Sequence, residues 1–217
     1  MHSYLLLIAI AILTQDQLSH PDDLLPWSAT ATVTDGTSTV VRFQACIASK
    51  HLIVRAVHDK GWHTYAMDNR QRAMKALQGK QSLGIEEGLQ VKITKGATLT
   101  GKWLQTPPKD LSQPEMRWYT YGFEDSTYLA CPIQQEDTPE TVTLEIKGQA
   151  CNSSSCRQVD LTLNCQAVQL ESTQQRQLNE QIAKLLKELA PVIFEDSHTP
   201  GRAPKVSSSG TDPDMPD

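Results

Sequence analysis

Two cysteines separated by four polar residues are the part of this sequence best suited to chemistry. Cys151 and Cys156 flank an Asn-Ser-Ser-Ser segment, with alternating apolar residues before and after them. This spacing lets the cysteines face each other across the mouth of a hairpin, within the ~4.4–6.8 Å between Cα atoms that a disulfide needs. Cross-linking so small a loop stabilises by only about 2 kcal/mol. Because strained, exposed disulfides exchange readily, the spacing allows two interpretations: a redox-active pair or a static clip on the hairpin.

The residues around the two cysteines favour different orders of reaction. Arg157 follows Cys156 directly and would favour a thiolate there, whereas Cys151 ends a strand and is expected to be the more exposed of the two. Asn152-Ser153-Ser154 also matches the N-x-S acceptor of a glycosylating secretory pathway. A glycan at Asn152 would cover both cysteines and argue against exchange.

The other three cysteines lie in alternating apolar segments. Cys131 and Cys165 continue the apolar phase of their segments and are expected to point into a core, while Cys46 falls on the opposite phase. Buried free thiols behave as small hydrophobes, so all three can be packing residues. A Cys131–Cys165 bridge across the core is the alternative.

The histidines do not form a recognisable metal motif. His51, His58 and His63 are close in sequence, but no carboxylate or thiolate stands at zinc spacing from them. Trp62 and Tyr65, on either side of His63, are expected to fill the core. Hydrolase, zinc-protease and nucleotide-binding motifs are absent from the sequence, so we expect neither a metal nor another cofactor.

The elements that position the cysteines read as strands. Residues 141–148 and 158–165 alternate apolar and polar side chains and predict two half-buried antiparallel strands. One short helix is predicted at 71–78. Further short strands are predicted at 28–34, 41–47, 52–57, 62–66, 89–93 and 127–133. Strands at this spacing predict an all-β chain folded as an antiparallel β-sandwich.

The amino-terminal end predicts export. Residues 4–13 are uncharged and apolar, and at ~1.5 Å per residue they cover only about half of a ~30 Å hydrocarbon layer. We therefore interpret residues 1–20 as a signal peptide, with a buried strand or helix as the alternative. Export implies a periplasmic or secreted protein in a compartment that permits disulfides, and no membrane span after signal cleavage. The formal net charge of -5 argues against nucleic acid as a partner.

The carboxy-terminal end has two parts. Residues 171–194 repeat leucine and isoleucine at spacings of three and four, which predicts an amphipathic helix that ends near Pro191. Its apolar stripe is expected to dock on its own domain, with a partner helix as the alternative. Residues 197–217 are rich in Pro, Ser, Gly and Asp and predict a disordered tail.

Residues 26–168 resemble the amino-terminal periplasmic domain of the thiol:disulfide interchange protein DsbD and its stand-alone relatives. The resemblance rests on Gly61-Trp62-His63-Thr64-Tyr65 and on Gly148-Gln149-Ala150-Cys151 with Cys156. It implies an immunoglobulin-like sandwich in which Cys151 and Cys156 are the redox pair. A proline that often follows the second cysteine in that family is replaced here by Arg157-Gln158.

The resemblance also assigns a role to an aromatic stretch, residues 118–123. This stretch falls where the family has a cap loop over the disulfide, so Tyr119, Tyr121 and Phe123 become candidate cap residues, with Glu124 and Asp125 as nearby acids. The alternative is that Trp118 and Phe123 simply fill the end of the sandwich.

Together these features favour an exported thiol–disulfide interchange module that passes electrons through Cys151 and Cys156 to or from partner proteins. It would be a candidate component of a thiol–disulfide oxidoreductase. Neither a thioredoxin-like nor an electron-conducting membrane domain follows in the sequence. The resemblance therefore implies that a thioredoxin-like or membrane electron donor acts in trans. The rival hypothesis is a β-sandwich binding protein whose disulfide is structural and whose loops do the binding.

Overall fold

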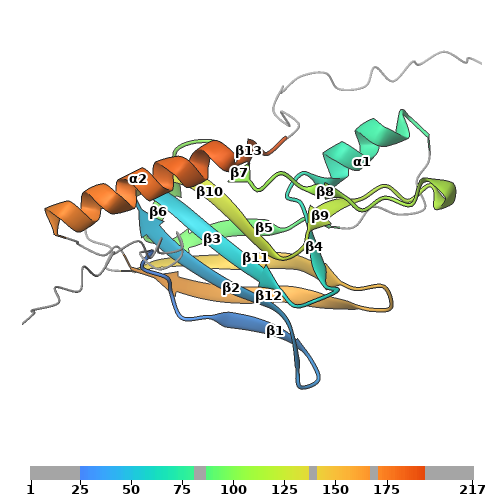
Figure 1. Ribbon diagram of the computed structural model, residues 1–217, viewed down its shortest axis with the longest axis horizontal. Helices are drawn as coiled ribbons and strands as arrows, with labels where there is room; N and C mark the ends of the chain where they lie inside the picture. Colours follow the sequence, from blue (N-terminus) through green and yellow to red (C-terminus); the bar gives the residue numbers. More distant parts are fainter. Residues whose placement is uncertain (1–24, 81–86, 137–140, 167–170, 194–217) are drawn as a thin grey trace, which may run out of the picture.

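Two antiparallel sheets face each other in the computed structural model, which describes residues 25–80, 87–136, 141–166 and 171–193 (Figure 1). The first sheet has the order β1 (Ala31–Asp35), β2 (Ser38–Ala48), β3 (His51–His58), β10 (Ser126–Gln135), β7 (Leu104–Gln105) and β13 (Ala190–Pro191), and β6 (Ala97–Leu99) also pairs with β10. The second has the order β12 (Cys156–Cys165), β11 (Val142–Cys151), β4 (His63–Tyr65), β9 (Tyr121–Phe123) and β8 (Lys109–Asp110), and β5 (Gln90–Lys95) pairs with β11. This architecture confirms the predicted immunoglobulin-like sandwich. The predicted signal peptide (1–20) and tail (197–217) lie outside the described residues.

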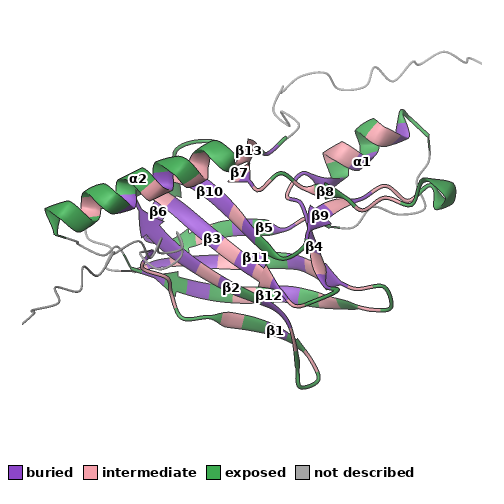
Figure 2. Cartoon of the chain, viewed as in Figure 1, coloured by how far each residue is buried: buried purple, intermediate pink, exposed green. Residues whose placement is uncertain are grey.

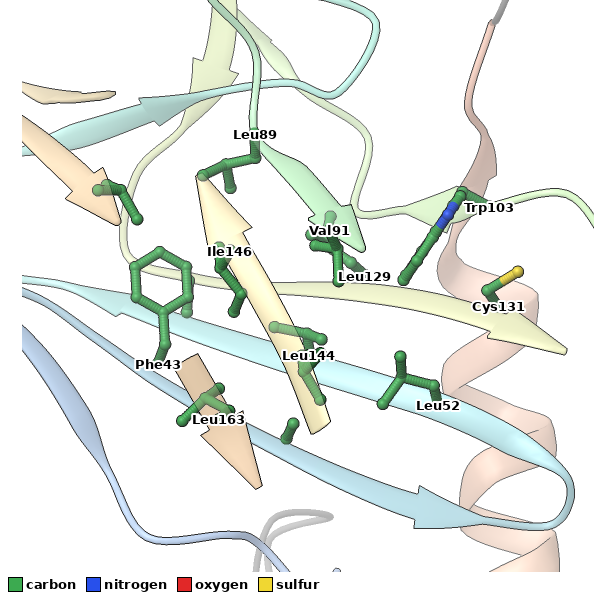
Figure 3. Packing of buried hydrophobic residues seen from close by; sticks show 14 of the residues in the cluster. Phe43, Leu52, Leu89, Val91, Trp103, Leu129, Cys131, Leu144, Ile146 and Leu163 are labelled. Atoms are coloured by element: carbon green, nitrogen blue, oxygen red, sulfur yellow. The ribbon is translucent and has the colours of Figure 1, made fainter. Parts of the chain in front are cut away.

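The main core lies between the two sheets (Figure 3). Phe43 and Leu52 of the first sheet and Leu144 and Ile146 of the second are fully buried there. Along β11, buried residues alternate with more exposed ones, as a strand with one face on a core requires (Figure 2). The positions that alternate with the core residues therefore lie on the outer face of the second sheet.

Helix α2 (Ser172–Glu188) covers the outer face of the first sheet (Figure 1). Leu178 and Ile182 of the helix are buried in a second apolar cluster with Cys46 and Ala48 of β2 and Ile53 of β3. The amphipathic stripe thus docks on its own domain. The helix ends at Glu188, shortly before the expected end near Pro191, because the residues ahead of Pro191 take up extended backbone and β13 pairs with β7. None of the helices in the described part of the chain is both long and apolar enough to span a bilayer.

Each strand expected from the sequence overlaps a strand of the structure, and the helix expected at 71–78 corresponds to α1 (Asn69–Leu77). The elements that the pattern did not predict are very short. They are β6, β7, β8, β9, β13 and the 3-10 turn η2 (Pro114–Met116). Strands of two or three residues carry almost no periodic signal, so pairing with neighbours distant in sequence defines them.

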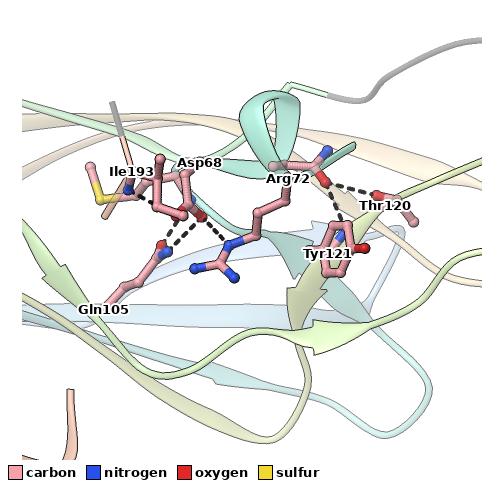
Figure 4. A network of polar contacts seen from close by, with 8 residues as sticks. Asp68, Arg72, Gln105, Thr120, Tyr121 and Ile193 are labelled. Atoms are coloured by element: carbon pink, nitrogen blue, oxygen red, sulfur yellow. Dashed lines mark hydrogen bonds and ion pairs between the residues drawn. The ribbon is translucent and has the colours of Figure 1, made fainter. Parts of the chain in front are cut away.

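A buried polar network fastens the carboxy-terminal segment to the start of α1 (Figure 4). The carboxylate of Asp68, which is fully buried, accepts hydrogen bonds from Arg72 Nε at 2.8 Å, Gln105 Nε2 at 2.6 Å and the Ile193 N–H at 2.9 Å. The adjacent Asn69 accepts the Tyr121 N–H at 2.7 Å. The network therefore holds both the last described residues and the first residue of β9, a neighbour of the strand that flanks the disulfide.

Candidate functional site

Cys151 and Cys156 form a disulfide at the tip of the β11–β12 hairpin. They are directly opposed residues, with an S–S distance of 2.03 Å and a Cα–Cα distance of 4.0 Å. The Asn152 N–H donates to the Ser155 carbonyl at 2.9 Å, so the cysteines occupy the next, non-hydrogen-bonded pair, where side chains approach most closely. Asn152 Oδ1 accepts the N–H groups of Ser154 and Ser155, both at 2.8 Å. The cysteines face each other across the hairpin as the spacing predicts, but their Cα atoms are closer than the expected ~4.4–6.8 Å. Asn152 organises the turn.

The two sulfur atoms differ in access. Ala150 and Val159 point into the core, so the disulfide projects from the outer face of the second sheet. Cys151 is only 2 % exposed, whereas Cys156 is exposed and lies on β12, the edge strand of the sheet. The expectation that Cys151 is the more accessible cysteine is therefore wrong: the strand continues into a tight turn, and β4 flanks Cys151 on its other side.

Arg157 does not act on Cys156 in the way its sequence position suggested. Successive residues of a strand point to opposite faces, so the Arg157 side chain leaves the sheet on the side away from the disulfide. Its guanidinium forms an ion pair with Asp35 of β1.

His63 is the neighbour of Cys151 on the side away from Cys156. Strand β4 pairs with β11 so that His63 is opposite Cys151 and Thr64 is opposite Ala150. On the other side of β4, Thr64 pairs with Phe123, which brings Glu124 next to His63. The outer face of the sheet therefore carries a row of residues that are neighbours on adjacent strands, in the order Cys156, Cys151, His63 and Glu124. The sequence places His63 among histidines that form no metal motif and in the motif that carries the resemblance. Its pairing with Cys151 could not be predicted, because it joins segments far apart in the chain.

The surroundings of His63 set its charge state. The side chain is partly buried, its ring lies edge-on to Tyr65 with centroids 5.3 Å apart, and Nε2 is 3.4 Å from the Tyr65 hydroxyl. Burial lowers the pKa of His63, and the nearby Glu124 carboxylate acts in the opposite direction. Lys109 Nζ contacts Glu124 at 2.9 Å and Asp125 at 3.4 Å. Of the two predicted acids, Glu124 thus lies beside His63, and the Lys109 ammonium group is paired with both Glu124 and Asp125.

His58 lies on the side of β4 opposite to His63, and both of its ring nitrogens form hydrogen bonds within the fold. Its Nδ1 is 2.7 Å from the Asp125 carbonyl, which can only accept, so Nδ1 carries the proton. Nε2 then accepts the Thr64 hydroxyl at 2.9 Å. Burial lowers the pKa of His58, which favours this neutral form. Within the residues that the structure describes, no group of three or more His, Cys, Asp or Glu is arranged to hold a metal ion.

The candidate cap residues do not all lie on the face that carries the disulfide. Phe123 is 2 % exposed and belongs to the main core, and Tyr121 shares its phase on β9 and packs partly against that core. The alternative that Trp118 and Phe123 fill the sandwich is therefore confirmed for Phe123, whereas Trp118 is only partly buried and does not belong to the main core. Tyr119 precedes β9 and is partly exposed.

The remaining cysteines are free thiols. Cys131 and Cys165 lie in the main core and Cys46 lies under α2, which matches the faces expected from their phase. The alternative Cys131–Cys165 bridge is not formed; instead the Cys131 thiol donates to the Gly101 carbonyl at 3.2 Å. Burial raises the pKa of all three thiols, that of Cys165 to about 11. Such thiols are poor nucleophiles.

Fold and site together define a class: an immunoglobulin-like β-sandwich with a half-exposed hairpin disulfide at the end of one sheet. No family model and no curated protein matches the sequence. Among solved structures, the chain is similar to the DsbD amino-terminal domain of Neisseria meningitidis in the reduced form, with 12% sequence identity and a TM-score of 0.35. The alignment covers 58% of this chain and 83% of that one.

Proposed function

We propose that the protein is an exported thiol–disulfide interchange module that passes electrons through Cys151 and Cys156 to or from partner proteins. The observation that carries the proposal is the asymmetry of the disulfide. Cys156 is exposed on an edge strand, while its partner Cys151 is 2 % exposed. A purely structural clip has no need of one accessible sulfur, whereas exchange requires it.

The order of strands supports attack at Cys156. A thiolate attacks a disulfide along the S–S axis, from the side opposite the leaving sulfur. At Cys156 that approach comes from beyond the edge of the sheet. At Cys151 the corresponding direction of approach is blocked by β4 and His63.

The exchange then proceeds in two steps. The partner's thiolate forms a new S–S bond to Cys156 Sγ, the bond between the two cysteines breaks, and the electron pair remains on Cys151 Sγ. A second thiol of the partner resolves the mixed disulfide and leaves both cysteines reduced. In the opposite direction Cys156 attacks an acceptor disulfide and Cys151 resolves it. The partners we propose are a thioredoxin-like protein or a membrane electron donor, acting in trans in the periplasm or outside the cell.

Matched single-cysteine variants test this function. Cys151→Ser retains the exposed sulfur and Cys156→Ser retains the buried one. Each variant is incubated with the oxidised form of a thioredoxin-like protein, and mixed disulfides are mapped by mass spectrometry. We expect a mixed disulfide through Cys156 in the first variant and little or none in the second.

The reduction potential of the wild-type disulfide separates the proposal from the binding-module alternative. Equilibration with glutathione redox buffers gives this potential. A value below about -300 mV, together with no mixed disulfide in either variant, would identify a structural clip and contradict the proposal.

A cap over the disulfide is a further element of the proposal, and Tyr119 is the residue on which to test it. Tyr119 is partly exposed and lies outside β9, whereas Tyr121 and Phe123 contribute to the core. If Tyr119 shields the sulfurs, Tyr119→Ala should speed reduction by a small thiol several-fold and leave stability nearly unchanged. An unchanged rate in the folded variant would eliminate the cap.

A further inference from the structure

Reduction of the disulfide creates a charge in an unfavourable place. When the S–S bond breaks by attack at Cys156, the electron pair is left on Cys151, whose side chain is 2 % exposed. Burying an unpaired thiolate costs several kcal/mol unless a proton or a positive charge compensates it. The leaving sulfur therefore needs a nearby group that can supply a positive charge.

His63 is placed to supply it. It is the residue opposite Cys151 on β4, and both side chains project from the outer face of the sheet. Directly opposed side chains of neighbouring antiparallel strands have Cβ atoms about 4.5–5.5 Å apart, within reach of an imidazole and a thiol. His63 is also partly exposed, so its ring can exchange protons with water while it adjoins a sulfur that water scarcely reaches.

We propose that His63 is the acid–base residue of the exchange: it takes up a proton when the disulfide opens and pairs as an imidazolium with the Cys151 thiolate, and it gives that proton up when the disulfide forms. This inference rests on the proposed function for its direction of attack. During reduction the partner's sulfur bonds to Cys156 Sγ, the electron pair moves to Cys151 Sγ, and His63 takes a proton from water and donates a hydrogen bond to the new thiolate. During oxidation the Cys151 thiolate, held by the imidazolium, displaces the partner from Cys156, and His63 returns its proton to water.

The charged groups that face His63 permit this cycle. Burial lowers the pKa of the imidazole in the oxidised protein, and Glu124 opposes that effect. Lys109 is ion-paired with Glu124 and with Asp125 on the far side of the row and limits the negative charge there. His58, on the opposite side of β4, is itself buried and neutral. A thiolate at Cys151 is thus the new charge that would draw a proton onto His63.

Proton NMR of the imidazole rings tests the coupling directly. The full chain is titrated in the oxidised form and after reduction by a phosphine, which needs no protein partner. The titration midpoint of His63 should rise by about one pH unit or more on reduction, because an opposite charge has appeared beside it. His51, at the other end of β3 with its ring on the Ser49 carbonyl, is the internal control and should not move.

Kinetics provide the second readout. His63→Gln removes the titrating group, and His51→Gln is the matched control. We expect His63→Gln to slow reduction by a small dithiol at pH ~6 about tenfold or more, relative to the dithiol's thiolate concentration, and to flatten the pH profile of that rate. His51→Gln should retain the wild-type profile.

An unchanged midpoint for His63 in the reduced protein overturns the inference, as does a wild-type rate in folded His63→Gln. If His63→Gln does not fold, the NMR titration of the wild-type chain decides alone. Failure of the proposed function looks different: no mixed disulfide forms at Cys156, yet phosphine reduction still moves the His63 midpoint. If exchange occurs through Cys156 but the titration midpoint of His63 does not change on reduction, the proposed function stands and only the role of His63 is refuted.

Discussion

Asp68→Ala is the substitution that most directly tests how the carboxy-terminal segment is held to the rest of the fold. The carboxylate is fully buried and accepts hydrogen bonds from Arg72, Gln105 and the Ile193 N–H (Figure 4). Its removal leaves three donors without their acceptor, in a region that joins α1, β7 and the carboxy-terminal segment.

The expected magnitude follows from how well each donor can find water. The Gln105 side chain is fully buried, so its stranded amide costs about 1–3 kcal/mol. The Ile193 N–H loses a bond to a charged acceptor, which adds about 1–2 kcal/mol. The Arg72 side chain is 24% exposed and can rehydrate, so it contributes ~1 kcal/mol or less. Together these contributions lower the free energy of unfolding by about 2–6 kcal/mol. A central loss of ~4 kcal/mol lowers Tm by roughly 8–16 °C in a chain of this size.

Urea unfolding followed by tryptophan fluorescence measures this loss, since Trp62 and Trp103 are buried. Asp110→Ala is the matched control: its carboxylate is exposed and accepts the Ser112 N–H at 2.9 Å, so its loss should cost less than about 1 kcal/mol. Amide exchange at Val192, whose N–H is bonded to the Trp103 carbonyl, should accelerate in Asp68→Ala. If the two variants were equally stable, the argument that Asp68 secures the carboxy-terminal segment would be refuted.

Three further predictions concern the site and its surroundings. Burial lowers the pKa of His58 below its ordinary 6.5, so the unfolded chain binds more protons and the free energy of unfolding falls as the pH is lowered below about 6.5. His58→Gln should flatten this pH dependence in urea titrations between about pH 5 and 6.5. An unaltered slope would contradict the prediction. Asn152→Ala should cost about 1 kcal/mol in thermal unfolding while Asn152→Asp, which retains the acceptor, should not; equal losses would deny the turn role. Maleimide labelling after mild reduction should modify Cys156 first and Cys46 only after denaturation, as mass spectrometry can check.

The hairpin and its disulfide could be predicted because their signals are local. Alternation on both sides of Cys151 and Cys156 defines the two strands, and four intervening residues define the turn. The same rule of alternation could have shown that Arg157 points away from Cys156, since adjacent strand residues occupy opposite faces. Sequence adjacency was the wrong measure of proximity there.

The rest of the site depends on pairing between distant segments. His63 reaches Cys151 only because β4 inserts between β11 and β9, and β9 is a three-residue strand with no periodic signal of its own. The register of that insertion also decides that Phe123 enters the core while Glu124 approaches His63. Residue types alone could name these aromatic and acidic side chains but could not assign them to a face.

The burial of the three free thiols has a consequence for how the protein acquires its disulfide. Cys151 and Cys156 are only five positions apart, so the hairpin can bring them together within about 1–10 μs, before contacts between distant strands are made. Packing of the two sheets and of α2 then withdraws Cys46, Cys131 and Cys165 from oxidants and raises their pKa values. Oxidation therefore has one fast product, and the three buried thiols are kept apart from the Cys151–Cys156 disulfide as long as the chain stays folded.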